Sequence, residues 1–384
     1  MDKIHKNFEE TIESEGKINI PDYLDLTVPD TEELQKKISE SEDISYISKE
    51  ILQHATFDTT FKWPEKLPEG FDPEKLIEEG KNPGLGINEI HNDGITGKGV
   101  TVAIIDQKID PNHVEFKDNL IANNEYDPKQ EGISMHGPGV SSLLVGKKCG
   151  ISPDAKLYYA EGTISDYSGY TKALEDIIEY NKNLDKKIKI VSVSKGYMDD
   201  PGLDEWIKTK EKARENGITI IDSQYFAENF LTGGGAKNNK GDFNDYDLPL
   251  FYKKETPEEF KIKFNSLDKK QKEVILEKFG SIENIISLKE EKSKKEIIVP
   301  SDYRTIASRQ GSDVYRYGAS GGWSWAIPYY SGIFVLALQI NSELTNEEFL
   351  DIVKKTAVKN KKGLKVINPE GIIEEVKKMI EEEK

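Results

Sequence analysis

Three polar residues are of the types that together perform nucleophilic, acyl-transfer catalysis. Asp106 ends the apolar run 99–105, which is typical of a strand buried on both faces. His136 precedes a run of small residues predicted to be helical, and Ser324 follows two glycines and opens an apolar helix that ends near Ile340. The order aspartate, histidine, serine along a chain is one of the few known for a catalytic triad.

Each of these residues also has an ordinary structural explanation. An aspartate at a strand end is common, a lone histidine is more often structural than catalytic, and a serine before a helix can simply cap it. The glycines and apolar neighbours of Ser324 fit a hydroxyl held at a buried helix start, where the positive helix end favours developing negative charge. The combination of the three residues therefore carries the hypothesis.

Alternating strands and helices are predicted to position these residues. Apolar runs predict strands at 99–105, 156–160, 188–193 and 218–221, and helical spacing predicts helices at 171–181 and 203–216. This alternation indicates an α/β fold with a mostly parallel central sheet and crossover helices. Sites in such folds form at the carboxyl ends of the strands, where Asp106 lies.

Two segments differ from this pattern. Residues 1–88 are charged and contain several prolines, and we interpret them as an N-terminal extension, either packed on the main domain or propeptide-like. Residues 89–384 form the predicted main domain. A stretch rich in Lys and Glu at about 250–296 is predicted to be a helical insertion, with helices near 257–264 and 269–279.

Composition restricts the partners. The formal net charge of −17 over 384 residues disfavours nucleic acid, because an acidic surface repels phosphates. Cys149 is the single cysteine, so no internal disulfide can form. No apolar stretch is long enough to span a bilayer and the first residues do not form a secretory signal, so we expect a cytoplasmic protein without a membrane partner. No residue spacing predicts a metal site.

The three segments resemble those of the subtilisin-like serine proteases (subtilases, peptidase family S8). Ala-Ile-Ile-Asp at 103–106 is similar to the family's aspartate segment, and His136-Gly137 followed by Val140 is similar to its histidine segment. Gly-Trp-Ser-Trp-Ala-Ile-Pro at 322–328 resembles the family's Gly-Thr-Ser-Met-Ala-x-Pro. The resemblance covers about residues 84–380 and implies a subtilisin-like three-layer fold.

The resemblance also implies roles. Ser324 would attack a peptide carbonyl, His136 would take its proton and Asp106 would orient the imidazole, with a protein or peptide as substrate. Ser194, Lys195 and Gly196 match the segment that pairs with the substrate backbone as an added strand, and Ser168 and Gly169 are candidates for the opposite edge. No cofactor is expected; calcium often stabilises the family, but no loop here supports a calcium site.

Several residues depart from the family pattern. Gln107 and Lys108 follow the aspartate, Pro138 and Gly139 follow His136-Gly137, and Trp323 and Trp325 flank the serine. The family's oxyanion donor is an asparagine after a strand in an Ala-Gly-Asn setting, and here either Gln224 or Asn229 could supply the amide. Asp222 falls near the expected P1 pocket, which suggests a preference for a basic P1 residue.

Three functions agree with these observations. The first is an endopeptidase of restricted specificity. The second is a pseudoprotease that binds a peptide or protein without cutting it, because the oxyanion donor is uncertain. The third is a latent zymogen whose residues 1–88 block the cleft. The sequence predicts no oligomeric state.

Overall fold

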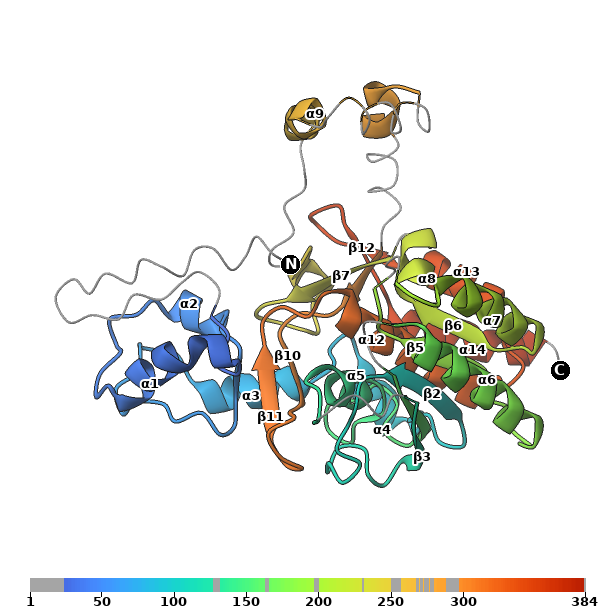
Figure 1. The fold of residues 1–384 in the computed structure, drawn as a ribbon, viewed down its shortest axis with the longest axis horizontal. Coiled ribbons are helices and arrows are strands. Elements are labelled where there is room, and N and C mark those ends of the chain that lie inside the picture. Colours follow the sequence, from blue (N-terminus) through green and yellow to red (C-terminus); the bar gives the residue numbers. More distant parts are fainter. Residues whose placement is uncertain are drawn as a thin grey trace.

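The computed structural model describes residues 24–126, 132–162, 166–196, 200–229, 231–249 and 297–382 (Figure 1). Between the last two ranges it also describes residues 257–266, 269, 272, 276 and 280–287. Within these residues the chain forms two five-stranded sheets and one three-stranded sheet. None of the helices in these ranges is both long and apolar enough to cross a membrane.

The central sheet is parallel, and its strand order is β3-β4-β2-β5-β6. Its strands are β2 (Thr101–Asp106), β3 (Leu120–Glu125), β4 (Lys156–Glu161), β5 (Ile190–Val193) and β6 (Thr219–Asp222). The four predicted strands are confirmed as β2, β4, β5 and β6. The edge strand β3 was not predicted, because its sequence Leu-Ile-Ala-Asn-Asn-Glu is largely polar and exposed.

Helices cover both faces of this sheet, which explains why β2 is apolar throughout. Val102 and Ile104 face a core shared with α5 (His136–Val145) and α12 (Gly322–Ile340). Ala103 and Ile105 face a second core shared with α6 (Ser168–Lys182) and α7 (Leu203–Glu215). The predicted α/β fold, a mostly parallel sheet between helical layers, is therefore confirmed.

A second sheet and the terminal helices complete the main domain. The order of this sheet is β12-β13-β9-β7-β8, and the central β7 and β9 are parallel. Its strands are β7 (Leu231–Ala236), β8 (Tyr246–Asp247), β9 (Ile297–Pro300), β12 (Val358–Lys359) and β13 (Lys365–Val366). The accompanying helices are α4 (Ile87–Asn92), α8 (Ser223–Glu228), η3 (Phe243–Asp245), α13 (Asn346–Thr356) and α14 (Pro369–Glu382).

The predicted helical insertion lies between β8 and β9. Helix α9 (Pro257–Ser266) confirms the first predicted helix, and residues 282–287 are also helical. The second predicted helix, at 269–279, lies mostly outside the described residues. The structure therefore supports the helical character of the insertion where it is described.

Residues 24–88 pack on the main domain as a small lobe, which we call the N-terminal lobe (Figure 1). It contains η2 (Pro29–Thr31), α1 (Glu32–Glu40), α2 (Lys49–Gln53), β1 (Phe57–Asp58) and α3 (Pro73–Lys81). Strand β1 pairs with β11 (Tyr315–Gly318) and so extends the hairpin that β11 forms with β10 (Arg304–Ala307). The lobe therefore shares a sheet with the main domain.

Arg316 on β11 fixes the N-terminal lobe to the main domain. Its Nη2 lies 2.9 Å from Asp25 Oδ2, and its Nε donates to Thr27 Oγ1 at 3.0 Å. Both charged side chains are mostly buried, which strengthens the pair relative to one on the surface. The Arg316 Nη1 also lies 3.6 Å from the sulfur of Met135, the residue before His136. The lobe is thus connected to the segment that carries the predicted catalytic histidine.

Gly137 allows helix α5 to begin close against the end of β2. A Cβ at this position would lie 2.1 Å from the carbonyl oxygen of Gln107 and 2.5 Å from the hydroxyl of Tyr159. Any other residue would therefore force α5 away from the strand that carries Asp106.

We expect the substitution Gly137→Ala to destabilise the protein by about 1–3 kcal/mol, because the methyl group has no space against the Gln107 backbone. The free energy of unfolding from urea titration measures this change. Gly241→Ala is the matched control, because Gly241 is exposed and the nearest atom to its Cβ is a side-chain oxygen 3.3 Å away. Equal stability of the two variants would contradict the close approach.

Candidate active site

The end of strand β2 and the start of helix α5 bring Asp106 and His136 together. The Nδ1 of His136 lies 2.7 Å from Asp106 Oδ1, and Asp106 is buried. The backbone N–H of Gln107 donates to the same oxygen at 2.8 Å. The hydrogen bond to Nδ1 leaves Nε2 of the imidazole available to a reacting group, which is the orientation that a general base requires.

A short chain of hydrogen bonds holds the histidine segment in place. The backbone N–H of His136 donates to Ser134 Oγ at 2.9 Å, and the Ser134 hydroxyl donates to the side-chain oxygen of Gln107. Gln107 is one of the residues that departs from the family pattern. Sequence reasoning did not identify Gln107 or Ser134 as positioning residues, because their contact depends on how the segment before α5 folds back on β2.

The environment of His136 changes its proton affinity. Burial lowers the pKa of His136, but the charge of Asp106 and its hydrogen bond outweigh burial, so the pKa lies above the ordinary value of 6.5. A base with a raised pKa binds its proton more strongly, so activity that depends on neutral His136 is lost as the pH falls through that pKa.

Ser324 lies in the first turn of α12, after a sharp approach that requires glycine. A Cβ on Gly321 would lie 2.1 Å from the carbonyl oxygen of Ser301, and Gly322 has a φ of 60°. The backbone N–H of Gly321 donates to Asp302 Oδ1 at 3.0 Å. The two glycines therefore set the position at which the helix, and with it Ser324, begins.

The carbonyl group of Ser324 has an unusual partner. In a regular helix it would accept a hydrogen bond from the N–H of residue 328, but Pro328 has no N–H. The hydroxyl of Ser194 donates to this carbonyl instead, at 2.9 Å. Pro328 lies in the second turn of α12, and Ser194 compensates for the missing donor.

Helices α5 and α12 bring Ser324 to the His136 side of the sheet. The ring of Trp325 lies 5.4 Å from the imidazole of His136, measured between ring centres. Among the described residues the Ser324 hydroxyl donates no hydrogen bond, so it is not hydrogen-bonded to His136 in this structure. Contacts between a nucleophile and its base are commonly long until substrate binds.

The predicted substrate-binding segment after β5 is engaged by neighbouring side chains. The carbonyl of Lys195 accepts from the Ser223 hydroxyl at 2.8 Å, and that of Gly196 accepts from Tyr167 OH at 3.0 Å. The buried ammonium group of Lys195 lies 2.6 Å from Asp200 Oδ2. Only part of the hydrogen-bonding capacity of this segment therefore remains for another strand.

The predicted opposite edge, Ser168 and Gly169, lies at the start of helix α6. Ser168 donates to the side chain of Asp166 and Gly169 is buried. The carbonyl groups of a helical segment accept hydrogen bonds within the helix, so those of Ser168 and Gly169 are not free to pair with an extended peptide.

The side-chain amides of the two predicted oxyanion residues, Gln224 and Asn229, bond to neighbouring groups and not to Ser324. The Nε2 of Gln224 donates to Glu228 at 2.7 Å and its Oε1 accepts from Lys210 at 2.7 Å. The Nδ2 of Asn229 donates to the carbonyl of Tyr225 at 2.9 Å. Both residues lie in or directly after the short helix α8, which the sequence did not predict, so their amides make local bonds.

The hypothesis that Asp222 favours a basic P1 residue loses its basis. The Asp222 carboxylate is buried, pairs with Lys210 Nζ at 2.9 Å and accepts from the backbone N–H of Tyr225 as the cap of α8. Its charge is already neutralised within the fold. The pair forms because α7 packs on β6, which a linear sequence does not reveal.

Residues 97–224, a segment that includes Asp106 and His136, match the sequence profile of the subtilase family. Over this segment the chain is similar to the subtilase family. Ser324 lies outside the matched segment, so its position is described by the fold alone.

Two relatives are similar to the chain over a longer stretch. The chain is 29% identical over 295 residues to serine protease AprX of Bacillus subtilis strain 168, and the alignment covers 68% of this chain and 61% of AprX. It is 23% identical over 337 residues to subtilisin amylosacchariticus of Bacillus subtilis subsp. amylosacchariticus, covering 85% and 73% of the two chains. The match thus spans less than two thirds of AprX.

Solved structures also align with the chain. The structure of the prenylagaramide maturation protease PagA is 17% identical and has a TM-score of 0.48. The alignment covers 76% of this chain and 98% of PagA.

We expect an NMR titration of the protein to give His136 a pKa above 6.5, and the Asp106→Asn variant to give a value below 6.5. The variant removes the charge that raises the pKa and leaves burial, which lowers it. His136→Gln identifies the signal by its loss. Identical titrations in wild type and variant would contradict the assigned cause.

We expect Lys210→Met to cost about 3 kcal/mol of stability, because it leaves the buried Asp222 carboxylate without its cation. Lys208→Met on the same helix is the matched control: its pair with Glu205 is exposed, and its loss should cost less than about 1 kcal/mol. Denaturant midpoints of the two variants measure the difference. Equal midpoints would show that the Lys210–Asp222 pair contributes no more than a surface pair.

Proposed function

We propose that this protein is a serine endopeptidase of the subtilase type, in which Ser324 is the nucleophile, His136 the general base and Asp106 the residue that orients the base. The observation that carries the proposal is the 2.7 Å hydrogen bond between His136 Nδ1 and the buried Asp106. A buried carboxylate paired with a histidine at the carboxyl edge of a parallel sheet is the half of the triad that fixes the tautomer of the base.

The position of Ser324 supports the nucleophilic role. In the proposed reaction its Oγ attacks the carbonyl carbon of a peptide bond while His136 accepts the hydroxyl proton. The first-turn N–H groups of α12 have no helical acceptor, so the backbone N–H of Ser324 can donate to the developing oxyanion. His136 then gives its proton to the leaving amine, and water releases the acyl group. No metal or other cofactor takes part in this scheme.

Aromatic residues around Ser324 support a restricted set of protein or peptide substrates. The Trp323 ring is 39% exposed beside the nucleophile and lies 6.4 Å from the ring of Phe226, measured between centres. The carbonyls of Lys195 and Gly196 are partly engaged by Ser223 and Tyr167. A substrate must therefore fit bulky rings and a backbone edge with few free acceptors.

A non-cleaving binding protein is the second candidate. It is favoured by the local bonds of the Gln224 and Asn229 amides, which leave the oxyanion site without an assigned side-chain donor. Loss of one such donor slows turnover by about 10²–10³-fold, which reduces but does not abolish peptidase activity. The endopeptidase therefore remains the main proposal.

The packing of residues 24–88 bears on the zymogen alternative. The pairing of β1 with β11 and the Asp25–Arg316 pair make the N-terminal lobe part of the folded protein. These contacts favour a permanent lobe over a segment that is removed.

A fluorophosphonate probe tests the proposal directly. We expect intact mass spectrometry to show one adduct on the wild-type protein and none on Ser324→Ala, because only an activated serine reacts at an appreciable rate. His136→Ala should also abolish labelling. Peptide hydrolysis by Ser324→Ala should fall by about 10⁶-fold, the size found when a subtilisin-type nucleophile is removed.

Ser320→Ala is the matched control, since Ser320 lies only four residues before the proposed nucleophile. This variant should keep the adduct. If the wild type gains no adduct, Ser324 is not activated and the binding-protein alternative takes the place of the endopeptidase.

A further inference from the structure

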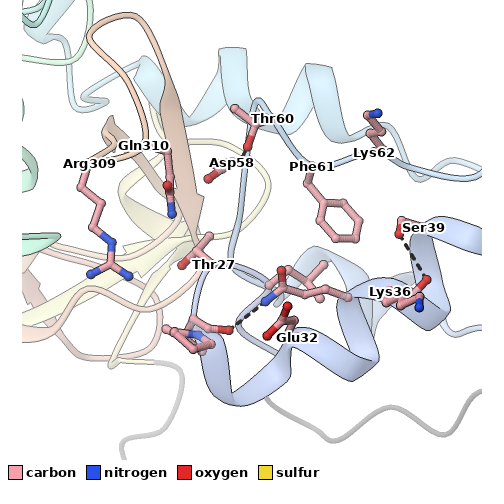
Figure 2. A pocket seen from close by; sticks show the side chains of 14 residues that line it. Thr27, Glu32, Lys36, Ser39, Asp58, Thr60, Phe61, Lys62, Arg309 and Gln310 are labelled. Carbon is pink, nitrogen blue, oxygen red and sulfur yellow. Dashed lines mark hydrogen bonds between the residues drawn. The ribbon is translucent and has the colours of Figure 1, made fainter.

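A groove runs between the N-terminal lobe and the turn of the β10–β11 hairpin (Figure 2). Its volume is about 660 Å³, and it is lined by residues of η2 and α1, by Asp58 at the end of β1 with residues 60–62 after it, and by Arg309 and Gln310 of the turn. Figure 2 shows Arg309 and Gln310 on one side and Lys36, Ser39 and Lys62 on the other. We call it the lobe groove.

The lobe groove adjoins the proposed active site through a smaller cavity. This second cavity has a volume of about 160 Å³ and shares Thr27, Val28, Arg309 and Gln310 with the groove. Its remaining lining includes Met135, the residue before His136. Two neighbouring cavities thus lie between the segment before His136 and the N-terminal lobe.

The proposed reaction predicts which part of a peptide substrate would approach the lobe groove. His136 would donate its proton to the leaving amine, so the substrate segment that follows the cleaved bond must leave on the histidine side. An extended peptide whose scissile bond lies at Ser324 would therefore run past Met135 towards the lobe groove. This step rests on the proposed function.

The charges in the lobe groove define the chemistry of its ligand. Arg309 and Lys62 are exposed and make no ion pair with any residue that the structure describes. The Asp58 carboxylate is buried and accepts from the N–H and hydroxyl of Thr60, at 2.9 and 2.5 Å. Glu32 is the remaining carboxylate of the lining.

Lys36 and Arg309 differ in how far their charges are already paired within the protein. Lys36 lies 3.9 Å from Glu40 on the same helix, which partly satisfies its charge. A free guanidinium such as that of Arg309 can hold a carboxylate through two parallel hydrogen bonds, and the neighbouring Gln310 amide can add a donor. In a chain of net charge −17, this local excess of unpaired cations is a feature that favours an anionic ligand.

We propose that the lobe groove binds the substrate segment that follows the scissile bond and selects an acidic side chain in it, through Arg309 and Lys62. The Arg316–Asp25 pair holds the lobe in position, so the groove exists before the peptide arrives and less ordering entropy is lost on binding. The N-terminal lobe thereby becomes part of the specificity of the enzyme.

Cleavage profiling of a peptide library tests the proposal in the full chain. We expect Asp and Glu to be enriched after the cleaved bond in products of the wild type, and this enrichment to vanish in the double variant Lys62→Glu/Arg309→Glu. Preferences before the cleaved bond should stay unchanged. The double variant Lys208→Glu/Arg214→Glu is the control, since it makes the same charge change on exposed positions of α7. Unchanged enrichment in the groove variant would overturn the proposal.

A binding measurement separates this proposal from the proposed function. Fluorescence anisotropy with the Ser324→Ala protein compares a labelled peptide of alternating Glu and Gly with its Gln–Gly counterpart. We expect about 5–10-fold tighter binding of the Glu peptide, the size of one or two partly exposed charge-assisted contacts, and a smaller ratio at 0.5 M salt. The groove variant should remove the ratio and the α7 control should keep it.

The cleavage and binding experiments together distinguish a wrong endopeptidase proposal from a wrong groove proposal. If the wild type cleaves no peptide and gains no fluorophosphonate adduct while the anisotropy ratio holds, the endopeptidase proposal is wrong and the anion-binding groove stands. If cleavage occurs but the Glu and Gln peptides bind equally, or the α7 control loses the ratio as the groove variant does, the groove does not select acidic segments.

Discussion

The buried carboxylate of Asp106 is the constraint on which the candidate site depends. A charge removed from water at the end of a strand must be satisfied by hydrogen bonds, because desolvation otherwise outweighs any gain from packing. Here the His136 imidazole and the N–H of Gln107 both donate to the same oxygen. This requirement fixes helix α5 against β2, and Gly137 is the residue that permits so close an approach.

The second half of the site follows from a backbone constraint. Pro328 deprives the Ser324 carbonyl of its helical donor, and the Ser194 hydroxyl at the end of β5 replaces it. The first turn of α12 is therefore attached to the central sheet by a side chain, at the edge where Asp106 also lies. The contact of Trp325 with the His136 ring then brings α5 and α12 to a common position.

Strand pairing and a buried ion pair also fix the N-terminal lobe beside the site. Its strand β1 continues the β10–β11 hairpin, and Arg316 connects Asp25 to the segment before His136. A groove between the lobe and the hairpin is thus held in fixed relation to the proposed general base. The lobe also covers apolar residues of the main domain, including the buried Cys149, whose thiol pKa is raised by burial. This thiol is packed in the core that the lobe and the main domain share.

The sequence by itself determined the parallel sheet and the location of Asp106, because a strand covered on both faces needs an uninterrupted apolar run and β2, β4, β5 and β6 each have one. It also determined where α12 begins, since two glycines before a long apolar stretch permit little else. The tertiary structure alone decided the partners of polar side chains. Asp222 pairs with Lys210, Ser168 starts a helix and Gln224 bonds within α8, because each of these outcomes depends on which helix packs against which strand. Edge strands such as β1 and β3 were likewise decided by pairing, since their own residues are few or polar and carry no pattern of burial.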